Sequence, residues 1–83
     1  MIAMTSKNGK CVRLTADYNL DTATVIYEVY CAEATFEFPE FAPAARVYKT
    51  LSERIKNETL TDACIKNLVA GARAMGYIAS SWR

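Results

Sequence analysis

The sequence predicts a single α+β domain: an antiparallel sheet of three to four strands with two helices packed on one face. With 83 residues the chain has room for one small domain, 1–83. Large apolar residues recur at every second position up to Phe38 and at every third or fourth position after Pro43. The expected order is therefore β-β-β-α-α, with a final edge strand as an option and residues 1–8 as a flexible N-terminus.

The first two strands are expected on either side of a turn at Asn19–Thr22, because Asn and Asp favour turns and the flanking segments alternate apolar and polar residues. Pairing across this turn places Leu14 opposite Tyr27 on the buried face. On the other face it places Arg13 opposite Glu28, an opposite-charge pair that favours the same register.

The third strand is expected at residues 33–38, where Pro39 closes it because proline cannot donate to a sheet ladder. The last segment, residues 77–83, reads as an edge strand or as a docked tail. Trp82 within it is either packed on the core or offered to a partner as an anchor.

The first helix is expected at residues 44–57, with Pro43 in its first turn, where a missing N–H costs nothing. The second helix is expected within residues 59–76. Thr59 with Asp62 three residues later resembles a capping box at its start.

The three cysteines, Cys11, Cys31 and Cys64, indicate buried thiols rather than a disulfide framework, because their number is odd and no secretory signal precedes them. A zinc site would need all three thiols and a carboxylate, since the chain has no histidine. No apolar run is long enough for a membrane span. We therefore expect a cytoplasmic protein with no membrane association and no metal.

Catalytic chemistry is not indicated. The missing histidine removes the commonest general base, and the three glycines are too scattered for a phosphate-binding loop. Outward-facing carboxylates such as Glu28 and Glu37 predict a solvated acidic face rather than an acid–base pair. We expect no enzyme activity and no cofactor.

Charge is unevenly distributed along the chain. Residues 1–40 contain three basic and six acidic side chains, whereas residues 41–83 contain seven basic and three acidic ones. The basic residues of the expected helices are Arg46, Lys49, Arg54, Lys56, Lys66 and Arg73. They leave nucleic-acid binding as an alternative function, because phosphate recognition needs clustered cations.

The solvent face of the sheet carries the predicted interface. The alternation places these residues on it: Cys11, Arg13, Thr15, Ile26, Glu28, Tyr30, Thr35 and Glu37. Ile26 and Tyr30 are then apolar groups within a rim formed by Arg13, Glu28 and Glu37, which is the layout of a contact patch. The competing interpretations are that single exposed apolar residues are normal, or that the C-terminal segment covers them.

A β-meander, the pattern T-F-x-F-x-x-F-x-x-A-x-x-x-Y-x-x-L at Thr35–Leu51 and a second helix together resemble some phage-encoded anti-CRISPR proteins in architecture over residues 10–75. The resemblance implies a stoichiometric inhibitor that docks on a CRISPR effector, and it assigns no individual residue. It points to a phage or mobile-element accessory protein.

The sequence thus predicts a small non-enzymatic protein-binding module. The alternatives are a small nucleic-acid-binding regulator that uses the basic helical surface, and a homodimeric structural protein that hides the sheet face against a second copy.

Overall fold

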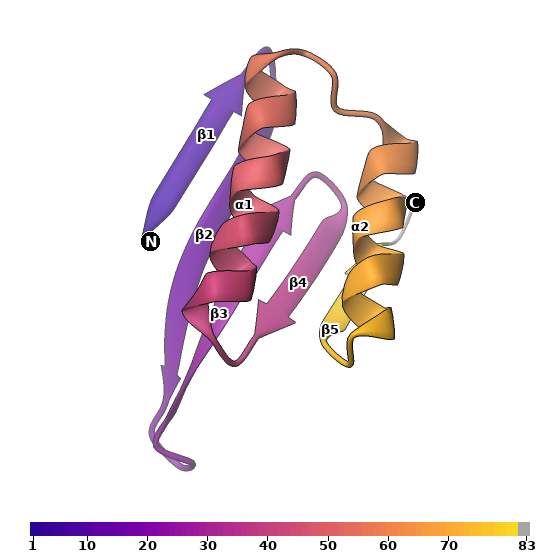
Figure 1. Ribbon diagram of the computed structural model, residues 1–83. Helices are drawn as coiled ribbons and strands as arrows, with labels where there is room; N and C mark the ends of the chain where they lie inside the picture. The colour runs from indigo at the N-terminus through magenta and orange to yellow at the C-terminus, as the bar shows by residue number, and fades with distance from the viewer. Residues whose placement is uncertain (82–83) are drawn as a thin grey trace.

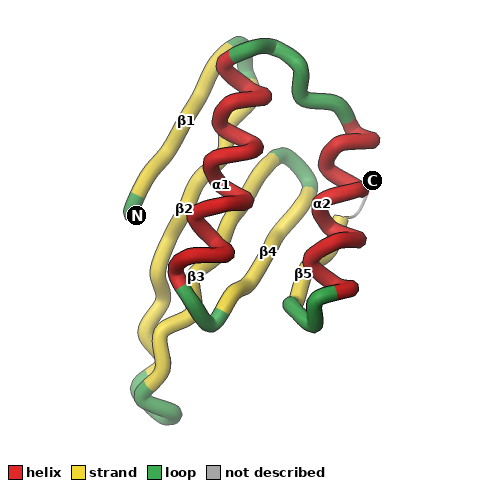
Figure 2. The backbone as a smooth tube through the Cα atoms, in the orientation of Figure 1, coloured by secondary structure: helices red, strands yellow, loops and turns green. Residues whose placement is uncertain are grey.

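The computed structural model describes residues 1–81 and confirms the α+β class (Figure 1). Within these residues the strands are β1 (Ala3–Lys7), β2 (Lys10–Asn19), β3 (Thr24–Cys31), β4 (Ala34–Phe38) and β5 (Ile78–Ser81), and the helices are α1 (Phe41–Lys56) and α2 (Asp62–Ala74). The strands form one antiparallel sheet in the order β1-β2-β3-β4-β5. Both helices connect β4 to β5 and lie on the same face of the sheet (Figure 2).

The sheet has five strands rather than three to four, because residues 1–8 contain β1 where the sequence analysis expects a flexible end. The turn between β1 and β2 consists of Asn8 and Gly9, whose φ angles are +52° and +79°. Two consecutive positive φ values are those of the tight hairpin turn that an Asn-Gly pair favours. The hairpin signal is therefore in the sequence, directly before the first strand that was expected.

The register of the β2–β3 hairpin differs from the expected one by two residues. Leu14 lies opposite Val29 rather than Tyr27, and Arg13 lies opposite Tyr30 rather than Glu28. The loop that joins the strands comprises residues 20–23. Because side chains alternate with a period of two, a shift of two residues changes the cross-strand partners and leaves every residue on its expected face.

Both helices begin slightly away from their expected positions. α1 begins at Phe41, whose ring lies edge-on to Tyr27 with centroids 5.5 Å apart. α2 begins after Thr61, whose hydroxyl accepts a hydrogen bond from the Cys64 N–H; Thr59 is not the cap. Neither helix within residues 1–81 combines the length and apolarity needed to cross a membrane.

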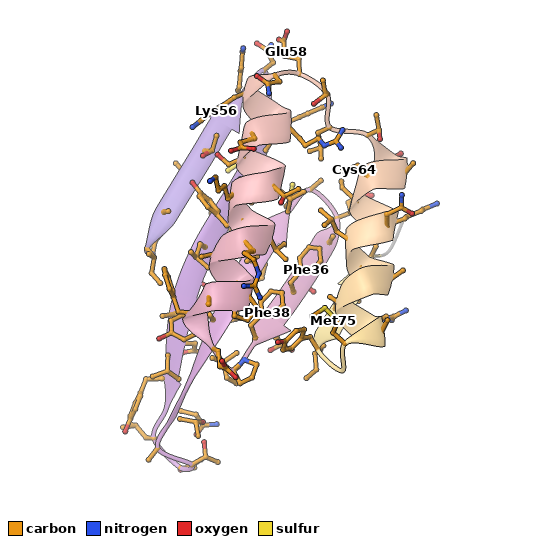
Figure 3. The ribbon with its side chains drawn as sticks, in the orientation of Figure 1. Phe36, Phe38, Lys56, Glu58, Cys64 and Met75 are labelled. Carbon is orange, nitrogen blue, oxygen red and sulfur yellow. The ribbon has the colours of Figure 1, made fainter. Side chains whose placement is uncertain are left out.

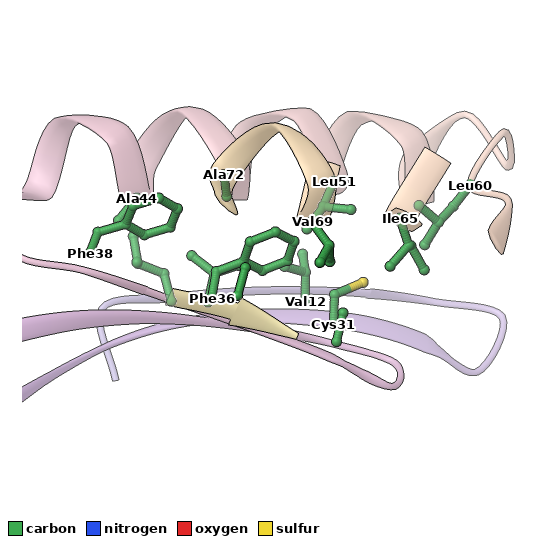
Figure 4. Packing of buried hydrophobic residues seen from close by; sticks show 14 of the residues in the cluster. Val12, Cys31, Phe36, Phe38, Ala44, Leu51, Leu60, Ile65, Val69 and Ala72 are labelled. Atoms are coloured by element: carbon green, nitrogen blue, oxygen red, sulfur yellow. The ribbon is translucent and has the colours of Figure 1, made fainter. Parts of the chain in front are cut away.

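The core lies between the sheet and the two helices (Figure 4). α1 packs on β1 to β4, and α2 packs on β4 and β5. Phe36 and Phe38 of β4 are fully buried, with parallel rings 6.3 Å apart, and both lie between the helices as seen in Figure 3. The aromatic pair therefore contributes to the burial of both helices.

The last described segment is an edge strand rather than a docked tail, so the first of the two expectations for it is confirmed over Ile78–Ser81. β5 pairs with β4, and the Arg73 Nε donates to the Ala79 carbonyl oxygen at 2.7 Å, which ties α2 to this strand. Trp82, for which the sequence left core and interface roles open, lies outside the described residues.

A small polar network joins the N-terminal strand to α1. The Thr5 hydroxyl lies 2.7 Å from the Tyr48 hydroxyl and 2.7 Å from the hydroxyl of Ser52. Ser52 is a buried residue, with 5% of its surface exposed. The Lys7 ammonium donates to the Lys56 carbonyl oxygen at the C-terminal end of α1. A cation is stabilised there by the partial negative charge of the helix dipole. β1 is thus tied to α1 at its middle residue and at its last residue.

We predict that Thr5→Val lowers the free energy of unfolding by about 1–3 kcal/mol, because it leaves the buried Ser52 hydroxyl without its partner on β1. Urea denaturation at neutral pH measures the change. Ser6→Ala is the matched control, since Ser6 is exposed and points to the other face. Equal stability of Thr5→Val and the wild type would contradict the role of this network.

Candidate functional site

The candidate site is the face of the sheet opposite the helices, which we call the open face. Both helices pack on the other face, so within residues 1–81 no helix covers this one. The cross-strand pairing assigns the following residues to the open face: Met4, Ser6, Cys11, Arg13, Thr15, Asp17, Ile26, Glu28, Tyr30, Thr35, Glu37, Ile78 and Ser80.

All five residues of the predicted interface share this face. Arg13 on β2 is exposed, and the other four, Ile26, Glu28, Tyr30 and Glu37, are half-buried on β3 and β4. The structure therefore brings the predicted residues together on neighbouring strands. That they bind a partner remains a prediction.

Two exposed apolar residues of the open face were not identified from the sequence. Met4 on β1 is 55% exposed and Ile78 on β5 is 68% exposed. Met4 was missed because β1 was missed, although the Asn8–Gly9 turn signals the hairpin. Ile78 follows from alternation in β5 once Ala79 is recognised as the buried residue of that strand.

The centre of the open face is a chain of polar contacts that begins at Arg13. The Arg13 guanidinium lies over the Tyr30 ring, 5.5 Å from its centroid, so this cation interacts with the π face of its cross-strand neighbour. The Tyr30 hydroxyl in turn donates a hydrogen bond to the Glu28 carboxylate on the same strand. Arg13, Tyr30 and Glu28 thus orient one another.

The hydrogen bond to Glu28 raises the pKa of Tyr30 to about 12, because deprotonation would place a phenolate against a carboxylate. Burial and the negative charges of Glu28 and Glu37 act in the same direction, and the Arg13 charge opposes them. Tyr30 therefore remains a neutral hydrogen-bond donor at every physiological pH.

Glu28 and Glu37 lie directly opposite each other on β3 and β4. Like charges in directly opposite positions destabilise an antiparallel pair. Arg13 is the only basic side chain among the described residues of the open face, and its direct cross-strand partners are Met4 and Tyr30 rather than either carboxylate. The sheet therefore contains a like-charge pair that a smaller or neutral residue would avoid.

Two hollows flank this centre. One, of about 550 Å³, is bordered by Met4, Cys11, Arg13 and Tyr30 on the open face and extends around the end of the sheet to Leu60 before α2. The other, of about 340 Å³, lies at the opposite end and is lined mainly by apolar groups, with Ile26 and Ile78 among them. The open face thus has a hollow at each end and a polar region between the two hollows.

Charge is unevenly distributed over the fold. From Leu14 to Ala45 the chain has six acidic residues and no basic one, and this stretch includes all of β3 and β4. The helices contain six basic residues against Glu53 and Asp62. The helical layer is therefore basic, whereas the five strands contain equal numbers of basic and acidic residues, with the acidic ones of β3 and β4 together on the open face.

The three cysteine thiols are free, and Cys31 is the buried one. Burial raises the pKa of the Cys31 thiol to about 11, so it stays protonated and is a poor nucleophile at neutral pH. Among residues 1–81, no group of three or more His, Cys, Asp or Glu side chains is placed to hold a metal ion.

No protein-family model matches this chain, and comparisons with curated proteins and with solved structures find no match either.

We predict that Tyr30 titrates near pH 12 rather than at its ordinary value of 10, and that Glu28→Gln lowers its pKa by removing the charged acceptor. NMR of ¹³Cζ-labelled tyrosine follows this titration, and Tyr30→Phe assigns the signal. Because the folded pKa is raised, the associated stability is complete below about pH 10 and is lost as the pH approaches 12. An unchanged Tyr30 titration in Glu28→Gln would exclude this hydrogen bond as the cause.

We also predict that Glu37→Gln stabilises the isolated protein by about 0.2–1 kcal/mol, because it removes the repulsion with Glu28 across the strands. Urea denaturation at low ionic strength measures the gain. High salt serves as the control, since it screens the charges and reduces the difference. A loss of stability at low salt would show that Glu37 makes a favourable contribution to the sheet.

Proposed function

We propose that the protein is a small non-enzymatic protein-binding module whose contact surface is the open face. The observation that supports this function best is an uncovered five-stranded face with exposed apolar residues at its ends and an ordered polar centre. Contact surfaces combine apolar anchors with polar groups that set orientation.

Each part of the face has a distinct role in this proposal. Ile26, Tyr30 and Ile78 supply apolar contact area at low conformational cost, since their strands already fix them. Arg13, Glu28 and Glu37 set specificity, because a partner must match their charges when water is excluded. Tyr30 belongs to both groups, as its ring and its hydroxyl are used separately.

The narrower form of the proposal is a phage or mobile-element accessory protein that inhibits its target by docking, with a CRISPR effector as the target. It is supported by the architectural resemblance to anti-CRISPR proteins. An inhibitor of this kind acts by occupying a surface and requires no catalytic group. The identity of the captured partner tests it directly.

A nucleic-acid-binding regulator is the second candidate, favoured by the six basic side chains of the helices. One of them, Arg73, already donates to the Ala79 carbonyl oxygen within the fold. Phosphate binding would weaken steeply between roughly 50 and 200 mM salt, whereas a largely apolar protein contact would not.

We predict that Ile78→Glu weakens partner capture at least about tenfold, as expected when an apolar anchor of the contact surface becomes charged. The tagged protein is used to capture partners from source-cell lysate, with and without nuclease, and the bound fraction is quantified. Met75→Glu is the matched control, because Met75 on the helical side is 69% exposed and Ile78 is 68% exposed. A partner that survives nuclease, is lost with Ile78→Glu and is retained with Met75→Glu is the expected result.

The opposite pattern would contradict the proposal. Loss of the partner with Met75→Glu alone would move the contact to the helical side, and loss on nuclease treatment would favour the nucleic-acid regulator. Light scattering of the purified protein tests the homodimer, whose second copy would occupy the open face.

A further inference from the structure

The hollow near β5 combines an apolar lining with a single charged residue. Its sides are formed by Ile26, Phe38, Pro39, Tyr77 and Ile78, and Glu37 is the one ionisable carboxylate among them. Its volume of about 340 Å³ is sufficient for one long side chain of a partner. The hollow therefore offers apolar contact along its length and negative charge at one position.

Glu37 has no neutralising contact in this arrangement. Within residues 1–81 the structure gives its carboxylate no hydrogen bond and no ion pair, and its direct cross-strand neighbour is the acidic Glu28. Arg13 is engaged with the Tyr30 ring on the far side of β3. A cation that enters the hollow would meet the Glu37 carboxylate without displacing an internal partner, and Glu28 lies directly across the strand pair from it.

The charge of the surrounding chain points to the same occupant. Asp17 lies directly opposite Ile26 on the open face, and Glu28 lies directly opposite Glu37, so three acidic residues of the described strands surround this hollow and no basic one does. A phosphate or an acidic protein surface would be repelled. A basic surface would be attracted, and its long side chains carry aliphatic stems that bury well against apolar residues.

We infer that the hollow receives a cationic side chain, arginine or lysine, presented by the apolar surface of a partner protein. The aliphatic stem lies against Ile26 and Ile78, and the charged head pairs with Glu37. This inference rests on the proposed function, because it assumes that the open face is the surface a partner contacts. It assigns that partner a basic and apolar docking segment.

The test compares two small probes that have similar shapes and differ mainly in charge. N-butylguanidinium carries the stem and head of an arginine side chain, and N-butylurea is its neutral counterpart of similar shape. Each is titrated into the ¹⁵N-labelled full chain, and amide shifts are followed by NMR. We expect the shifts to centre on Ile26, Glu37 and Ile78, with N-butylguanidinium bound about threefold more tightly than N-butylurea.

Two variants assign the preference to the carboxylate. Glu37→Gln should reduce the ratio of the two affinities to about one, since it keeps the shape and removes the charge. Glu53→Gln on α1, an exposed acidic position on the helical side, should leave the ratio unchanged.

Equal binding of the two probes in the wild type, or shifts centred outside the hollow, would overturn the inference. If that happens while Ile78→Glu still abolishes partner capture, the proposed function stands and only the cationic occupant is wrong. Self-association detected by sedimentation velocity and abolished by Glu37→Lys would identify a second copy as the occupant, which also overturns it.

Discussion

Phe36 and Phe38 on β4 provide the interaction on which the rest of the structure depends. β4 is the strand that both helices contact, and its two phenyl rings are fully buried. Phe38 borders a groove of about 210 Å³ between the helices, beside Val47 of α1 and Leu68 of α2, and its ring meets Tyr77 edge-on at 4.9 Å. The two helices cover different parts of the sheet and share only β4. Because the buried side chains of β4 all point to one face, both helices pack on that face, and the opposite face has no helix among the described residues.

The one-sided cover gives the second face its properties. Residues that alternate with Phe36 and Phe38 must point away from the helices, so Thr35 and Glu37 are presented together with their neighbours on β3. The same division affects the charges, since the helices contain six basic residues against two acidic ones, whereas the strands contain three of each. The acidic residues of β3 and β4 therefore lie on the face that the basic helices leave uncovered.

Alternation predicted the faces better than it predicted the pairing. Arg13, Glu28 and Tyr30 were assigned to the correct face even though the hairpin register was wrong by two residues, because an even shift preserves the face. The exact partners depend on loop length, and the loop after Asn19 includes Ala23 at a φ of +53°, a conformation that an alanine in the sequence does not signal. Met4 was not assigned to the open face for a different reason. The Asn-Gly turn at residues 8–9 is a recognisable hairpin signal, but the five-residue segment before it is short and only weakly apolar, so it does not by itself indicate a strand.

The Glu28–Glu37 pair is a place on the open face where the sequence departs from the choices that would stabilise this fold. Several other local features agree with the structure, among them the Asn-Gly turn, the Thr61 cap and the buried phenyl rings. Two facing carboxylates oppose that agreement, and natural proteins tend to place such conflicts at functional sites. A lysine on β4 opposite Glu28 would relieve the repulsion within the chain, but it would also remove the negative charge from the hollow beside Ile78. Under our proposal the compensating cation belongs to the partner, so the electrostatic cost in the free protein becomes a gain in selectivity when the complex forms.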